Sequence, residues 1–135
     1  MPSDCPFCEI EPGRVWLENE RALAIWDKYP CAYGHVLVVP RRHAASVFDL
    51  DDAERADLWA LVVEARRRLD DKYPIDGFNL GINDGQAAGQ TIMHAHVHLI
   101  PRREGDVPDP RGGVRWVIPE RARYWADEES PDGSP

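Results

Sequence analysis

Three histidines alternate along one short stretch of the 135-residue chain, at His94, His96 and His98. Successive side chains of a β-strand point to opposite faces, so a strand here would place all three imidazoles on one face. The chain has only five histidines, and neighbouring rings repel each other when both are protonated. Because each ring also has two nitrogens that need partners, the cluster indicates chemistry rather than ordinary polar surface.

Two chemistries suit three imidazoles on one face. Neutral imidazole is a common metal ligand, so two histidines spaced two residues apart can hold an ion in an open catalytic site. Alternatively, one neutral imidazole can attack phosphorus while its neighbour handles protons. The spacing alone leaves both alternatives open.

The cysteines suggest a second centre. Cys5 and Cys8 have the spacing of two zinc ligands on one loop, and the other reading is a frayed end with two free thiols. His43 and His94 are the candidates for the two further ligands that a closed site needs. Cys31 has no partner in this scheme and is expected only to pack, because an odd number of cysteines argues against a disulfide framework.

The surrounding pattern predicts an α+β domain in which an antiparallel sheet is backed by one helix. We expect a helical turn at 5–10, strands at 14–17, 22–26, 35–39, 78–82 and 95–100, and a short extended piece at 114–118. Asp49 or Asp51 can cap the helix, with Glu54 completing a capping box. Its core stripe comprises Leu58, Leu61, Val62, Ala65 and Leu69, and the expected strand buries Ala95, Val97 and Leu99.

The segment from Gly89 to Pro101 resembles the motif of the histidine-triad (HIT) family. The strand at 34–40, the helix after it and the loop at 83–90 follow in that family's order, so the resemblance covers about residues 5–103. It is similar to the bacterial, Hint-like and fragile-histidine-triad branches. The resemblance implies a five-stranded antiparallel sheet with one long helix and a short N-terminal helix, in a homodimer joined through its sheets.

The resemblance also implies roles for individual residues. His96 would be the nucleophile that forms a covalent nucleotidyl-histidine, with backbone near His94 fixing its tautomer. His98 would contact the phosphate and the leaving group, and His35 would support the cluster. The positions implied to bind nucleotide are Asp27 on the ribose hydroxyls, its neighbour Lys28, and Asn83, Gly89, Gln90 and Thr91 around the α-phosphate, together with His96 and His98.

The implied activity is hydrolysis at the α-phosphorus of AMP-containing compounds. The substrates would be adenosine phosphoramidates or dinucleoside polyphosphates such as diadenosine tetraphosphate. In the family, Cys5, Cys8, His43 and His94 correspond to a structural zinc set, which would lock His94 and so orient His96. The alternatives are a nucleotide-binding sensor without catalysis and a zinc-dependent hydrolase that uses the triad as its metal site.

Charge and composition restrict the partners. A net charge of −8 disfavours nucleic acid as a partner, and no apolar run reaches the length of a membrane span. The N-terminus lacks a secretory pattern, so the expected location is the cytoplasm. We expect one domain over 1–125, whose C-terminal segment at 104–125 offers Arg115 for a distal phosphate and Trp116 for a base, and a disordered acidic tail at 126–135.

Overall fold

The structure, a computed structural model, describes residues 4–129. The chain divides into two compact units, one ending at Arg102 and one beginning at Arg103, which are described separately. In the described residues, no helix combines the length and the apolar character that a membrane span needs.

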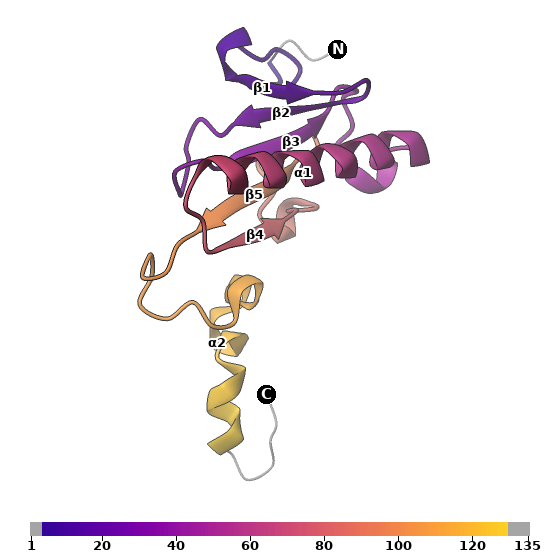
Figure 1. Ribbon diagram of the computed structural model, residues 1–135. Helices are drawn as coiled ribbons and strands as arrows, with labels where there is room; N and C mark the ends of the chain where they lie inside the picture. Colours follow the sequence, from indigo (N-terminus) through magenta and orange to yellow (C-terminus); the bar gives the residue numbers. More distant parts are fainter. Residues whose placement is uncertain (1–3, 130–135) are drawn as a thin grey trace. The chain divides into compact units, whose positions relative to one another are not determined.

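The first unit contains a five-stranded antiparallel sheet with the strand order β1-β2-β3-β5-β4 (Figure 1). The strands are β1 (Val15–Glu18), β2 (Ala22–Trp26), β3 (Val36–Pro40), β4 (Gly77–Gly81) and β5 (Val97–Arg102), and the long helix α1 is Asp52–Lys72. The expected element order and the antiparallel α+β architecture are confirmed. The expected N-terminal helix is a turn closed by Cys8 N–H donating to Cys5 C=O, followed by a 3-10 helix at Pro12–Arg14.

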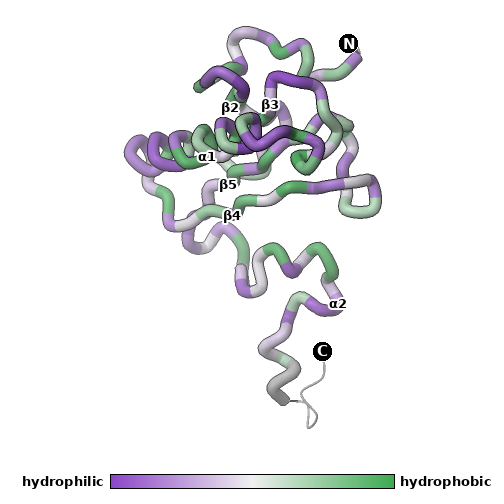
Figure 2. The backbone as a smooth tube through the Cα atoms, turned by 90° about the vertical axis from the view of Figure 1, so that its right-hand side faces the viewer, coloured by the Kyte–Doolittle hydropathy of each residue, from purple (hydrophilic) through white to green (hydrophobic). Residues whose placement is uncertain are grey.

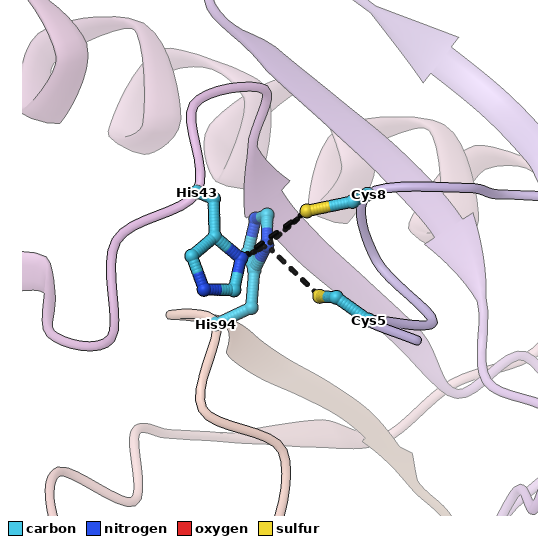
Figure 3. A group of neighbouring side chains, drawn as sticks. All are labelled: Cys5, Cys8, His43 and His94. Carbon is cyan, nitrogen blue, oxygen red and sulfur yellow. Dashed lines mark hydrogen bonds between the residues drawn. The ribbon is translucent and has the colours of Figure 1, made fainter. Parts of the chain in front are cut away.

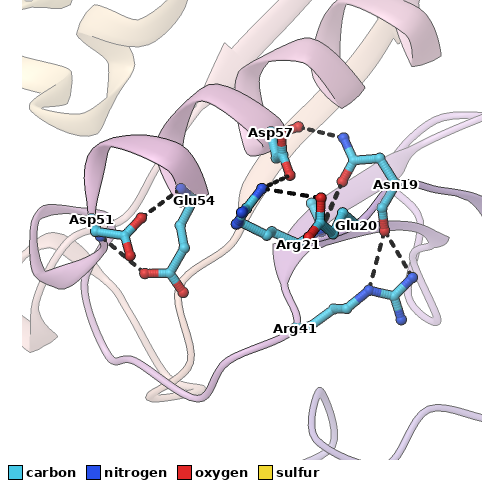
Figure 4. Close-up of polar contacts among 8 residues, drawn as sticks. Asn19, Glu20, Arg21, Arg41, Asp51, Glu54 and Asp57 are labelled. Carbon is cyan, nitrogen blue, oxygen red and sulfur yellow. Dashed lines mark hydrogen bonds and ion pairs between the residues drawn. The ribbon is translucent and has the colours of Figure 1, made fainter.

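Helix α1 begins with the expected capping box. Asp51 accepts from the backbone N–H of Glu54, and the Glu54 side chain accepts from the backbone N–H of Asp51 (Figure 4). Hydrophobic and hydrophilic stretches alternate along the helix (Figure 2). All five residues of the expected core stripe are buried: Leu58, Leu61, Val62, Ala65 and Leu69.

We expect Asp51→Ala to lower the free energy of unfolding by about 1 kcal/mol, because the first turn of α1 loses an N-cap acceptor. The neighbouring Asp52→Ala is the matched control. The Asp52 side chain is fully exposed and contacts Arg55 at the surface, so its removal should change stability by less than about 0.5 kcal/mol. Urea unfolding of both variants measures these changes. Equal losses of unfolding free energy in the two variants would show that the Asp51 cap does not stabilise α1.

The two faces of the sheet bury different partners. The face that packs against α1 includes Ala24, Val38 and Leu99, which belong to one buried cluster with the helix stripe. The opposite face buries Leu37 together with Phe7, so the N-terminal segment covers part of it. Because Val97 and Leu99 point toward α1, the intervening His98 projects to the face that the helix leaves open.

The second unit differs from expectation. The segment predicted as extended at 114–118 is a 3-10 helix over Gly113–Val117, followed by a short helix α2 (Pro119–Ala122). Gly112 and Gly113 both have positive φ, which turns the chain so that Arg115 N–H donates to Gly112 C=O. Part of the tail predicted to be disordered, 126–129, belongs to a 3-10 helix at Tyr124–Glu129; the rest lies outside the described residues.

Candidate active site

The segment that carries the three histidines is only partly a strand. β5 begins at Val97 rather than Ala95, so His94 and His96 precede it. The reason lies in their partners: Ala95 N–H donates to Ala44 C=O, and His94 Nε2 donates to Pro40 C=O. The expected strand start at Ala95 is therefore two residues too early, although Ala95, Val97 and Leu99 are buried as expected.

The His96 ring is held in one orientation by its own backbone. His96 Nδ1 lies 2.8 Å from His94 C=O, which can only accept, so Nδ1 carries the proton and donates it. In the neutral form of the ring, Nε2 is then the nitrogen that carries the lone pair. The His98 ring lies beside it, with ring centroids 5.1 Å apart.

His98, His35 and Asp27 come together from three neighbouring strands. His35 Nε2 lies 3.0 Å from His98 Nδ1 and 3.2 Å from Asp27 Oδ2. Asp27 directly follows β2 and His35 directly precedes β3, and the antiparallel register places them side by side, with Asp27 N–H donating to His35 C=O. The resemblance implied that His35 lies beside the triad, and the structure places it there and adds Asp27 to the same cluster.

Burial keeps these rings neutral. It lowers the pKa of His98 from 6.5 to about 4, with further lowering by His96 and His35, and it lowers the pKa of His35, while Asp27 opposes both shifts. Neutral imidazole at neutral pH is what nucleophilic attack and hydrogen-bond donation from a defined tautomer require.

These shifts predict a loss of stability in acid. A histidine whose pKa is lowered by folding binds fewer protons folded than unfolded, so stability falls as pH drops from about 6.5 towards about 4. We expect the urea midpoint to decrease over that window, and less steeply in His98→Asn. An equally steep decrease in the variant would show that other groups account for the acid sensitivity.

The four residues of the expected metal set lie together (Figure 3). Cys8 Sγ is 3.2 Å from His43 Nδ1, Cys5 Sγ is 3.5 Å from His94 Nδ1, and the two histidine Nδ1 atoms are 3.2 Å apart. Tetrahedral zinc with ordinary bond lengths would separate sulfur from nitrogen by about 3.5 Å and nitrogen from nitrogen by about 3.3 Å. His94 Nε2 donates to Pro40 C=O, which leaves Nδ1 free to bind a metal.

The loop before His94 is fixed by Gln90. This side chain is buried, accepts from Gly85 N–H and donates to the carbonyls of Ala45 and Ile92. Gly89 has a φ of 98°, in the left-handed region where glycine is favoured, and caps the 3-10 helix at Gln86–Ala88. These contacts give Gln90 a structural role in shaping the loop, and its contact with nucleotide stays a prediction.

The remaining candidates are placed as follows. Lys28 and Thr91 are exposed, and Asn83 is half-buried in the loop after β4. In the second unit, the Arg115 guanidinium donates to Arg121 C=O and lies over the Tyr124 ring, while Trp116 Nε1 donates to Arg111 C=O. Arg115 and Trp116 therefore have internal partners in that unit, and their substrate contacts stay predictions.

Phe7 is a site residue that the sequence reasoning missed. Its ring meets the rings of His94 and His96 edge-on, with centroids 5.8 and 5.1 Å away. It also lines a surface pocket with apolar neighbours that include Ile10, Val15 and Leu23. The sequence offered one signal for this role, which is the position of Phe7 between the candidate metal ligands Cys5 and Cys8. A metal bound by these cysteines and by the histidines would hold Phe7 against the histidine rings.

The chain belongs to the HIT family, since the family model described as the HIT domain matches residues 9–105. It is 40% identical to a hypothetical histidine triad nucleotide-binding protein of Sulfolobus tokodaii whose solved structure superposes with a TM-score of 0.70, over 78% of this chain and 73% of that one. This match and the observed sheet and helix confirm the HIT fold.

Two curated relatives have names that describe reactions. An asymmetrical bis(5'-nucleosyl)-tetraphosphatase of Schizosaccharomyces pombe is 35% identical over 107 residues, which are 78% of this chain and 59% of the relative. An adenylylsulfatase of Arabidopsis thaliana is 34% identical over 110 residues, 78% of this chain and 56% of the relative. The chain thus spans somewhat more than half the length of these two proteins.

Proposed function

We propose that the protein hydrolyses AMP-containing compounds at the α-phosphorus through a covalent nucleotidyl-His96. The observation that carries the proposal is the 2.8 Å hydrogen bond from His96 Nδ1 to His94 C=O, because it leaves the Nε2 lone pair available for attack. The adjacent His98 supplies a second imidazole on the open face of the sheet. Relatives named for a dinucleoside tetraphosphate and for adenylylsulfate support an α-phosphorus reaction with differing leaving groups.

The chemistry has two steps. His96 Nε2 forms a bond to the α-phosphorus while the bond to the leaving group breaks, and the leaving group takes up a proton from solvent. Water then attacks the same phosphorus and returns a proton to solvent, the bond to His96 breaks, and AMP is released with His96 restored. The loop that contains Asn83, Gly89, Gln90 and Thr91 would hold the α-phosphate, and Asp27 and Lys28 would lie near the ribose. The negative charge on the α-phosphate oxygens in the transition state would be stabilised by hydrogen-bond donors of this loop that are already in position.

We also propose that Cys5, Cys8, His43 and His94 bind a structural zinc ion. The support is the set of interatomic distances, which fits tetrahedral zinc, and the hydrogen bond that leaves His94 Nδ1 free. The ion would connect the N-terminal segment to the residue whose carbonyl orients His96. Cys31, like the other two cysteines, forms no disulfide, which suits a reducing compartment such as the cytoplasm.

The assembly and the C-terminal segment belong to the same proposal. We propose a homodimer joined through its sheets, because β4 lies at an edge with unpaired backbone groups. Segment 104–125 would then adjust substrate preference through Arg115 and Trp116. Light scattering gives the mass in solution, and Arg115→Ala should change discrimination among substrates.

Side-by-side assays test the activity. We expect the protein to release AMP from adenosine 5'-phosphoramidate, from diadenosine tetraphosphate, or from both, and the preferred compound would assign the leaving group. Binding of AMP without turnover of either compound would favour the sensor alternative.

The zinc-hydrolase alternative has weaker support. It requires a metal held by His96 and His98, whereas the second group of possible ligands among the described residues is Asp27, His35 and His98. A chelator that removes activity in step with a metal bound by His96 would favour this alternative.

A further inference from the structure

We infer that Asp27 is a positioning residue for the chemical step, acting on His98 through His35. The inference rests on the proposed function, and it assigns to Asp27 a task distinct from holding ribose. Its basis is the continuous contact from Asp27 Oδ2 to His35 Nε2 at 3.2 Å and from His35 Nε2 to His98 Nδ1 at 3.0 Å.

The tautomer of His35 is fixed from both sides. Cys31 N–H lies 3.2 Å from His35 Nδ1 and can only donate, so Nδ1 accepts and the ring proton lies on Nε2. On the opposite side, the Asp27 carboxylate can only accept and carries negative charge beside Nε2, which also favours a proton there. His35 is 4% exposed, so water has little access to substitute for either partner.

The fixed tautomer of His35 sets that of His98. His35 Nε2–H can donate to His98 Nδ1 at 3.0 Å, so His98 Nδ1 is the acceptor and its own proton lies on Nε2. His96 has the opposite arrangement, with its proton on Nδ1. The two neighbouring rings therefore present a bare nitrogen for attack and an N–H that can donate to the phosphate or the leaving group.

The Asp27 carboxylate is well suited to this task because both of its oxygens are used. Oδ1 accepts from Tyr29 N–H at 2.9 Å, and Oδ2 faces His35 Nε2. An asparagine has one acceptor and one donor at the same positions, so it cannot satisfy both neighbours. Either Tyr29 N–H loses its acceptor or an amide N–H confronts His35 Nε2–H. A ribose hydroxyl, which can both donate and accept, would tolerate asparagine.

The test compares Asp27→Asn with wild type on two AMP derivatives. In AMP p-nitrophenyl ester the leaving group departs without help, whereas in adenosine 5'-phosphoramidate the leaving nitrogen needs a hydrogen-bond donor. We expect kcat on the phosphoramidate to fall by about 10- to 100-fold, kcat on the ester by less than about 3-fold, and KM for both to stay within about 3-fold. Asp52→Asn removes the same charge at a fully exposed position and should change neither rate.

Nitrogen-15 NMR of the imidazoles gives a readout that a purely structural role would not produce. We expect wild type to show the proton on Nε2 in both His35 and His98, and Asp27→Asn to show a changed tautomer mixture in both. Equal rate losses on the two substrates with a raised KM would overturn the inference and leave Asp27 as a ribose contact. Unchanged tautomers in the variant would also overturn it. Failure of wild type on both substrates would instead contradict the proposed function.

Discussion

Replacing His96 with alanine is expected to lower the rate of AMP release by at least about 10⁴-fold, because the variant has no nucleophile for the first step. Binding should persist, since the loop before His94 and the His98 ring remain. We expect the Kd for AMP, measured by calorimetry, to change by less than about 3-fold, which corresponds to less than about 1 kcal/mol. A large loss of rate without loss of binding is what nucleophilic catalysis predicts.

Two comparisons give this result its meaning. Met93→Ala alters an exposed side chain three residues before His96 and should retain wild-type turnover. Turnover that survives in His96→Ala would contradict the mechanism, whereas loss of both turnover and AMP binding would indicate that the variant disturbs the site as a whole. Circular dichroism of each variant establishes whether it is folded.

Removal of the proposed zinc should have the second large effect. Cys8→Ser should lose bound zinc and lower the melting temperature by more than about 10 °C, because a structural metal contributes its binding free energy to folding. Turnover should fall as well, since His94 would lose the ion that fixes its position, and the carbonyl of His94 orients His96. Elemental analysis of protein purified without chelator measures the zinc content, and calorimetry measures the melting temperature.

Cys31→Ser is the matched control for this substitution. Cys31, which was expected to pack, is instead exposed. It lies outside the group formed by Cys5, Cys8, His43 and His94, so its replacement should preserve both zinc content and melting temperature. Wild-type protein that contains no zinc, or a Cys8→Ser variant with unchanged zinc and stability, would contradict a metal site here. The thiols would then be packed side chains of the N-terminal turn.

The sequence correctly predicted those helices and strands whose ends are determined by a strong local pattern. Asp51 and Glu54 cap α1 as expected, because their spacing alone satisfies the first backbone donors of a helix. The β2 boundaries at Ala22 and Trp26 also agree, since the strand is bounded by polar residues on both sides. The Cys5-x-x-Cys8 spacing predicted half of the metal set. His43 and His94 are 51 residues apart in the chain, so only the resemblance supported joining these two candidates to it.

The sequence could not predict features that depend on distant partners. Period two suggested a strand from Ala95, but β5 begins at Val97, because Ala95 N–H donates to Ala44 C=O and the His94 ring to Pro40 C=O. Likewise, no local pattern shows that Gln90 binds three backbone groups or that Asp27 faces His35, because tertiary contacts fix both. The sequence shows glycines at 112 and 113 but not their positive φ, with which the apolar segment after them forms a 3-10 helix instead of an extended piece.

The stereochemistry of hydrolysis at the α-phosphorus tests the central claim most directly. A substrate made chiral at that phosphorus by sulfur substitution is hydrolysed in water labelled with oxygen-18, and the configuration of the product is determined. Attack by His96 followed by attack of water inverts the phosphorus twice, so the account predicts overall retention. Overall inversion would show that water attacks the substrate directly, and it would contradict a covalent nucleotidyl-His96.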